Sequence, residues 1–584
     1  MKASKILCLF LAVFILLGFA ACSKPQEQTT PDNEVLQTEP PPIEESAPPS
    51  SEPQEEQNEE KVLRIRINEE LFLNGSLSSV WLWDCLTDRL LYMDPTEPEN
   101  IKGCLAESWS HSDDYLTWKF QIKENVYFSD GTLCDAKAIC EAFDMKLKLN
   151  LSGWSDSFYS EQLCRLANWY VTGEYELTME LSQPCAWFEM QLCQSSFSIK
   201  SPTAVKLYGT LDDRSLVGTG PYIYEGGISD VKTNEKWAQL RANKNYHMSE
   251  RYPDFDVIYL DFNRTENETY PPRPPKRSYE ELFTMLDNGE LDVVVFGLSN
   301  IKNICQYDEI VPLCEQRGYA LHTYTSRSAG AMWFNPTVFE PFMSADVREA
   351  VCRFIDLNEL NAVMYSGQGK VQSSIWADGR SSAVPFDGYY TSPEEGLALL
   401  AEAGYECSDI VFTSQVLDSG HNRDIMRQIS AQLEQYGIQM DVKLHTTGVY
   451  SPGNNAAALN IPLNIEQIYG SGPHALWRGV MSDNDYDPMP YVMTGSRYDC
   501  YKFSWQEVYD PDLYAQMCDL YDRMMTTPHW DEMVECSREL TRIVQEDYAA
   551  LPLVQEPVFF AVRDGAEEQF KALTETSMFK WMYQ

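Results

Sequence analysis

The sequence has few basic residues for its size. Its 584 residues contain 45 Lys and Arg against 88 Asp and Glu, so the formal net charge is -43. Nucleic acids and anionic membrane surfaces are bound by clusters of positive charge. The charge therefore argues against both as partners and indicates a surface that keeps the protein soluble outside the cell.

The sequence also lacks the motifs that an enzyme would need. It contains no HExxH zinc pattern, no GxSxG nucleophile turn, and neither of the phosphate-binding patterns GxxxxGK[ST] and GxGxxG. Its seven histidines show no metal-ligand spacing, and each is expected to be a surface residue or a core residue with its hydrogen bonds satisfied. The prediction is a protein that is not an enzyme and has no cofactor and no metal site.

No CxxC pair occurs among the sixteen cysteines, and their spacing forms no compact disulfide framework. Four of them lie within apolar helical patterns, where a thiol packs as a small hydrophobic group: Cys140, Cys352, Cys518 and Cys536. We therefore expect mostly free thiols, which indicates a source that lives without much oxygen.

The N-terminus has the pattern of a secretory signal. Lys2 and Lys5 precede an uncharged apolar run, Ile6–Ala21, which is shorter than the roughly 20 residues that span a bilayer. The run ends in FAAC, which resembles the bacterial lipobox, although Phe19 stands where leucine is usual. Cys22 is therefore the expected lipidation site, and two or more acyl chains would hold the protein at the membrane. The alternative is an ordinary cysteine just after a conventional cleavage site.

The segment after this signal is expected to be disordered. With residues 1–21 as the signal peptide, residues 22–60 form an acidic linker rich in Pro and Glu that contains no aromatic residue. Such a segment cannot bury enough apolar surface to fold. A flexible chain of this length spans on the order of 35 Å, and proline and like charges extend it further. The sequence therefore predicts a folded body that begins at residue 61 and is tethered near the membrane.

Strand and helix signals alternate along this body, which indicates a mixed α/β class. Val62–Ile67 alternates as a strand does. Asp135 is the expected N-cap of a following helix. A second helix is expected to begin with a capping box of Ser392 and Glu395, to have proline at its first position, and to stop at Gly404.

Eight segments carry a family pattern, in this order: Leu105–Thr132, Val217–Tyr224 (VGTGPYIY), Tyr279–Val295, Met332–Pro336 (MWFNP), Asp346–Leu360, Leu399–Tyr405 (LLAEAGY), Ala431–Leu444 and Tyr548–Phe560. Together they resemble the extracellular solute-binding proteins of bacterial ABC importers, in the group that binds oligopeptides and dipeptides, called family 5. The segments cover nearly the whole body.

The resemblance implies an α/β, two-lobed fold like that of periplasmic binding proteins (type II, cluster C), with a hinged interlobe cleft that closes on its ligand. Lobe I would comprise residues 61–325, with an extra subdomain at about 85–200. Lobe II would comprise residues 326–551, and residues 552–584 would return to lobe I.

The resemblance also implies a lipid-anchored monomer on the extracellular face of the cell membrane. It would capture peptides and deliver them to an ABC permease in the membrane. Two alternatives remain: the same fold binding another solute, such as a saccharide or a metal chelate, or a surface sensor or interaction protein.

The resemblance places a carboxylate in lobe II that neutralises the amino terminus of the peptide. In the family this aspartate follows a tryptophan and lies four residues before the proline of an acidic-Pro pair. Trp477 and Asp487–Pro488 match that pattern, but the carboxylate position is Asn484. Asp483 and Asp485 flank it, and either could bind the amine after a one-residue shift. The alternative is that both acids only cap a turn.

For three other features, ligand binding and a purely structural role are both considered. In Val217–Tyr222 (VGTGPY) the glycines allow φ values that other residues avoid, so a structural role in lobe I near the hinge is expected. Asn335 lies where the chain enters lobe II and could hydrogen-bond the backbone or the ligand. Trp81, Trp83 and Tyr92 could line the cleft or pack in the core.

Overall fold

The fold was analysed in a computed structural model, in which the described residues belong to one compact unit, Glu59–Gln584. The described residues are 60–70, 85–93, 100–148, 166–182, 184–193, 197–209, 213–226, 237–263, 278–296, 307–325, 329–334, 339–376, 381–417, 421–445, 463–468 and 511–571. Among them, no helix combines the length and the apolarity that crossing a bilayer requires. The predicted signal peptide and Cys22 lie outside this part of the chain.

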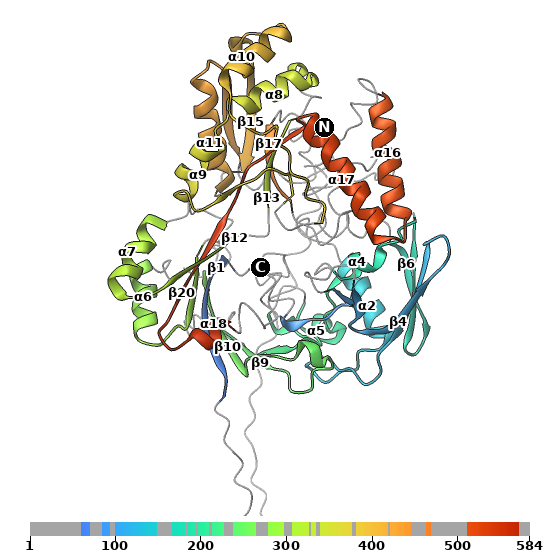
Figure 1. The fold of residues 1–584 in the computed structure, drawn as a ribbon. Helices are drawn as coiled ribbons and strands as arrows, with labels where there is room; N and C mark the ends of the chain where they lie inside the picture. The colour runs from blue at the N-terminus through green and yellow to red at the C-terminus, as the bar shows by residue number, and fades with distance from the viewer. Residues whose placement is uncertain are drawn as a thin grey trace, which may run out of the picture. The chain divides into compact units, whose positions relative to one another are not determined.

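The largest sheet has seven strands in the order β12-β20-β11-β1-β10-β9-β8 (Figure 1). Its strands are β1 (Val62–Glu70), β8 (Tyr222–Tyr224), β9 (Trp237–Ala242), β10 (Val257–Asn263), β11 (Val293–Phe296), β12 (Leu321–Thr325) and β20 (Pro557–Val562). β1 is parallel to β10 and β11, and the other pairs are antiparallel. Every residue of β20 is buried, as a continuous apolar run in an inner strand should be.

Helices α6 (Tyr279–Asp287) and α7 (Tyr307–Arg317) cover part of this sheet. Phe283 of α6 and Ile310 of α7 share a hydrophobic cluster with Val294 and Phe559. A second cluster, which includes Leu63 and Phe560, buries other residues of the same strands. The short helix α18 (Glu567–Lys571) follows β20.

A second sheet has four antiparallel strands in the order β4-β5-β7-β6. They are β4 (Ala106–His111), β5 (Thr117–Ile122), β6 (Leu166–Gly173) and β7 (Glu176–Leu181), and nearby lie the hairpin β2 (Leu91–Met93) and β3 (Ile101–Gly103) and the helices α2 (Ala136–Lys148), α4 (Phe188–Leu192) and α5 (Pro202–Tyr208). Their hydrophobic core also includes residues of α16 (Pro511–Thr526) and α17 (Trp530–Glu546). Trp187 fixes this contact, because its indole N–H donates to the carbonyl of Thr527 at 2.7 Å.

A third core lies around the three-stranded sheet β17-β13-β18 and the parallel pair β15 and β16. Its elements are β13 (Ala329–Phe334), β14 (Lys370–Val371), β15 (Val411–Leu417), β16 (Gln439–His445), β17 (Leu463–Ile468), β18 (Ala550–Pro552), β19 (Val554–Gln555), α8 (Ala345–Arg353), α9 (Leu357–Tyr365), α10 (Pro393–Glu402) and α11 (His421–Glu434). Buried aromatic rings such as Phe342, Phe354 and Phe412 fill it.

Two stretches of chain join the three-stranded sheet to the seven-stranded sheet. β18 pairs with β13, and β20 a few residues later pairs with β12 and β11. Since β12 and β13 are also consecutive in the chain, the stretches 321–334 and 550–562 run between the sheets. Strand β20, which lies late in the chain, therefore belongs to the same sheet as β1, the strand that begins at Val62.

Both helices begin where the sequence predicts, after Asp135 and with Pro393 at the first position, but only one has the predicted capping bond. The carboxylate of Asp135 accepts a hydrogen bond from the amide of Ala138 at 2.7 Å, so this predicted N-cap is confirmed. The predicted capping box of Ser392 and Glu395 is wrong, because the side chain of Ser392 makes no capping hydrogen bond. The carboxylate of Glu395 accepts instead from the Tyr390 hydroxyl at 2.6 Å.

The eleven cysteines in the described part of the chain are free thiols. All of them are buried except Cys140 and Cys518, which are partly buried. Burial raises the pKa of thiols such as Cys314, Cys407 and Cys536 and so keeps them protonated. For these residues the expectation of mostly free thiols is confirmed.

Candidate functional site

The side chains that the sequence predicts for ligand binding are outside the described residues: Asn335, Trp477, Asp483 and Asp485. The same holds for the candidate cleft aromatics Trp81 and Trp83. Their roles stay predictions. The described residues do show what surrounds the VGTGPY motif, which was singled out from the sequence, and a buried polar cluster lies there.

The glycines of the VGTGPY motif allow two backbone segments to approach closely. A Cβ atom on Gly218 would lie 2.2 Å from the carbonyl oxygen of Leu86, and one on Gly220 would lie 2.5 Å from the carbonyl carbon of that residue. Neither glycine has a positive φ, so the expected reason for them is wrong. They are needed because no side chain fits between the motif and residues 85–87. This contact is structural, as expected for the motif.

Asp88 follows this contact and is the centre of a buried polar cluster. Its Oδ2 accepts a hydrogen bond from the Thr219 hydroxyl at 3.0 Å and lies 2.9 Å from His247 Nε2. Its Oδ1 accepts from the Tyr246 hydroxyl at 2.9 Å and from the Arg251 guanidinium at 3.3 Å. We call these five residues the Asp88 cluster. It joins the motif to the turn after β9.

The turn after β9 is itself held against the motif. The amide of Asn243 donates to the carbonyl of Pro221 at 2.7 Å, and its side-chain amide donates to the carbonyl of Gly220 at 3.0 Å. Because both bonds fix the end of β9, the next residues, Tyr246 and His247, are directed at the carboxylate of Asp88. The site therefore depends on backbone contacts as well as on side chains.

The environment of Asp88 keeps its carboxylate ionised. Burial alone would raise its pKa, but the hydrogen bond and charge of His247, the charge of Arg251 and the hydrogen bond from Tyr246 lower it to about 2. A buried carboxylate of this kind is stable only because its neighbours replace the water that it has lost.

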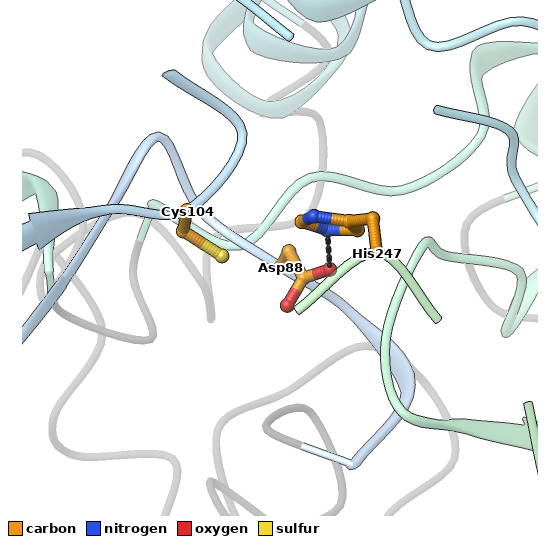
Figure 2. Close-up of side chains that lie close together, drawn as sticks. All are labelled: Asp88, Cys104 and His247. Carbon is orange, nitrogen blue, oxygen red and sulfur yellow. Dashed lines mark hydrogen bonds and ion pairs between the residues drawn. The ribbon is translucent and has the colours of Figure 1, made fainter. Parts of the chain in front are cut away.

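Cys104 adds a thiol beside the carboxylate of Asp88 and the imidazole of His247, and all three side-chain types can bind metal ions. It lies between β3 and β4, and Figure 2 shows its thiol near Asp88 and His247. One donor atom from each of these three residues lies within 4.8 Å of the other two. Within the residues that the structure describes, this is the one group of three or more His, Cys, Asp or Glu side chains placed in this way.

The chemistry of Cys104 is that of a protonated thiol. Burial, followed by the charge of Asp88, raises its pKa to about 12. Since the thiolate is the nucleophilic form, the cluster as it stands does not present an activated cysteine at neutral pH.

Tyr92 borders the cluster, and its ring packs beside Cys104 and Tyr246. The guanidinium carbon of Arg251 lies 4.6 Å from the centre of this ring, which is a cation–π contact. Of the two alternatives for Tyr92, the structure shows packing against other side chains.

The sequence revealed neither the Asp88 cluster nor the position of Cys104 beside it. Asp88, Cys104 and His247 are far apart in the chain, so no spacing between them is informative. The one sequence signal was the VGTGPY motif, which contributes Thr219. His247 was expected to be an ordinary surface or core residue, and its placement against Asp88 depends entirely on the fold.

Residues 100–499 match the family described as "Bacterial extracellular solute-binding proteins, family 5 Middle". Among relatives, the chain is 25% identical over 276 residues to the Escherichia coli protein named "Probable D,D-dipeptide-binding periplasmic protein DdpA". This similarity covers 46% of the chain and 47% of DdpA, so the chain spans about half the length of that relative.

Two solved structures have the same fold. NikA from Brucella suis, in complex with Fe(III)-EDTA, has a TM-score of 0.64 and 16% identity, over 86% of this chain and 95% of NikA. DppA from Helicobacter pylori, in complex with the peptide STSA, has a TM-score of 0.60 and 16% identity, over 86% of this chain and 94% of DppA. The predicted two-lobed α/β fold of periplasmic binding proteins is confirmed. With more than half of its residues matched, the chain belongs to family 5 of the bacterial extracellular solute-binding proteins.

Proposed function

We propose that the chain is the lipid-anchored, extracellular solute-binding component of an ABC importer, and that it captures peptides and delivers them to the permease. The observation that carries this proposal is the family match over residues 100–499. The printed names of DdpA and of the DppA complex, which refer to a dipeptide and a peptide, support peptides as the solute class.

The proposed binding chemistry suits a solute whose side chains vary. A peptide held in an extended conformation is recognised through its main chain, much like an added strand, while hydrated pockets accept different side chains. Asp483 or Asp485 would pair with the peptide amine, with Trp477 and Asn335 nearby. Closure of the lobes lowers the local dielectric and strengthens this pairing.

The proposed division into lobes follows the order of the chain. Residues 61–325 would form lobe I, with its extra subdomain at about 85–200, and residues 326–551 would form lobe II. Residues 552–584 would return to lobe I. The stretches 321–334 and 550–562, which join the two sheets, are then the segments about which the lobes would move.

The tether is part of the proposal. Lipidation of Cys22 would hold the chain on the extracellular face of the membrane, and residues 22–60 would let the body move while it stays near the permease. A monomer is sufficient for this task, because each body would carry its own site.

A second candidate is the same fold with a solute that is not a peptide. The observation that favours it is the similarity to NikA, whose structure contains Fe(III)-EDTA. Stacked aromatic side chains without a nearby carboxylate would suit such a ligand, whereas a carboxylate in the cleft suits a peptide amine.

A ligand screen by thermal shift tests both candidates. The chain would be mixed with a pool of short peptides, with saccharides, or with metal chelates, because a ligand that binds only the folded state raises the melting temperature. A rise with peptides alone supports the proposal. A rise with chelates or saccharides but not with peptides would replace it by the second candidate.

A further inference from the structure

We propose that Asp88, Cys104 and His247 form a binding site for one divalent transition-metal ion of the zinc class. The site uses none of the residues proposed to bind the solute and does not depend on the proposed function. Its donors are a carboxylate oxygen, a thiol sulfur and an imidazole nitrogen, all within 4.8 Å of one another (Figure 2). This mixture of donors is one that zinc uses.

The distances require only a small rearrangement. Bonds of about 2.0–2.3 Å in a tetrahedral site place the donor atoms roughly 3.2–3.8 Å apart. His247 Nε2 and Asp88 Oδ2 are 2.9 Å apart, so the ion would separate them by a few tenths of an ångström. The Cys104 sulfur lies within 4.8 Å of one donor atom of each of the other two residues, and it would move inward by about 1 Å. A water molecule or a solute would supply the fourth ligand.

The surroundings of Asp88 already resemble the outer shell of a metal site. Tyr246 and Arg251 donate to Oδ1, and Thr219 donates to Oδ2. Hydrogen bonds of this kind orient a ligating carboxylate and tune its affinity. Arg251, the positive group that faces the carboxylate, contacts Oδ1, whereas His247 lies at Oδ2. The ion would therefore bind on the oxygen that Arg251 does not contact.

His247 is held in the cluster by two contacts. Its Nε2 lies 2.9 Å from Asp88 Oδ2, and its ring centre lies 5.0 Å from that of Tyr246. Its Nδ1 is buried and has no hydrogen-bond partner among the described residues. The ring therefore already presents Nε2 to the carboxylate oxygen that would share the ion.

Metal binding moves protons as well as charge. Ligation through Nε2 requires the neutral imidazole with its proton on Nδ1, so the proton between Nε2 and Asp88 Oδ2 leaves to Nδ1 or to solvent. The Cys104 thiol loses its proton to solvent when the metal–sulfur bond forms. Carboxylate and thiolate then offset the two charges of the ion, and the charge of Arg251 remains as one net positive charge in the cluster.

The ion would cross-link three segments that meet at the VGTGPY motif. Asp88 precedes β2, Cys104 lies between β3 and β4, and His247 follows β9. The consequence would be a more stable lobe I. Chelation should lower its stability, and the bound ion should not exchange with the transported solute.

Cobalt titration tests the proposal, because a thiolate bound to Co²⁺ gives a charge-transfer absorption band in the near ultraviolet. The full chain would be purified in detergent, reduced and free of metal. We expect one Co²⁺ per chain with this band, and displacement of Co²⁺ by Zn²⁺. Cys104→Ser should abolish the band, and His247→Gln should weaken binding by about tenfold or more.

Cys134→Ser is the matched control, because Cys134 is also a buried free thiol but is not part of the group. Its band should equal that of the unmodified chain. A band that persists in Cys104→Ser would overturn the proposal, and so would an unmodified chain that binds no Co²⁺. The second result needs no variant, so it stands even if a variant fails to fold.

Discussion

Replacing Asp88 by Asn should destabilise the metal-free chain by about 3–5 kcal/mol, because it leaves the buried guanidinium of Arg251 without its counter-charge. The lowered pKa of Asp88 points in the same direction. Its fall from the ordinary 3.8 to about 2 corresponds to about 2 kcal/mol of preference for the ionised form. Asparagine keeps the shape of the side chain but places an NH₂ group where other donors already converge. The expected cost is therefore about 3–5 kcal/mol rather than about 2 kcal/mol.

Urea unfolding at neutral pH, followed by tryptophan fluorescence in the presence of a chelator, measures this loss. Asp113→Asn is the control, because Asp113 is exposed in the turn between β4 and β5. The same chemical change should there alter the free energy of unfolding by no more than about 0.5 kcal/mol. If Asp88→Asn costs under about 1 kcal/mol, or no more than the control, then the carboxylate does not compensate the buried charge as argued.

Four other expectations follow. The difference in free energy of unfolding between the unmodified chain and Asp88→Asn should be constant above about pH 4 and should shrink as the pH falls toward 2. The reason is that the carboxylate stabilises the folded state only while it is ionised, and a difference that stays constant in acid would contradict this. Gly220→Ala should cost about 2 kcal/mol or more in the same urea assay, because its Cβ would overlap backbone atoms, and an unchanged midpoint would refute the close approach. Cys22→Ala should release the protein from membranes into the soluble fraction, and unchanged retention would exclude lipidation. Asp483→Asn or Asp485→Asn should weaken binding of peptides with a free amine much more than of N-acetylated peptides, and an equal loss would show that neither acid is the anchor.

Local signals in the sequence were sufficient where one short segment decides the structure. Val62–Ile67 lies within β1, and the Asp135 cap forms with a residue only three positions later. Gly404 follows α10 with a φ of +85°, which favours glycine. In each case the interacting groups are neighbours in the chain, so the pattern contains the information.

Prediction failed where other groups compete for a side chain. The capping box at Ser392 is absent, and Glu395 instead accepts from the nearby Tyr390 and lies 3.5 Å from the guanidinium of the more distant Arg353. The glycines of the VGTGPY motif were expected for their φ values, but they are required by contact with Leu86. A sequence shows that a glycine is present, but it does not show which segment will pack against it.

The Asp88 cluster is the extreme case of this limit. Its residues come from three parts of the chain, and only the fold brings them together. A buried aspartate in a sequence looks like any other aspartate, because its burial and partners depend on long-range packing. The family resemblance pointed to one member of the cluster, Thr219 in the VGTGPY motif, and to none of the others.

Native mass spectrometry of the chain, purified without refolding, shows directly whether it captures a solute. We expect co-purified masses that fit short peptides and that exchange when a mixed peptide pool is added. A protein that carries no such mass and does not bind any member of the pool would contradict peptide capture.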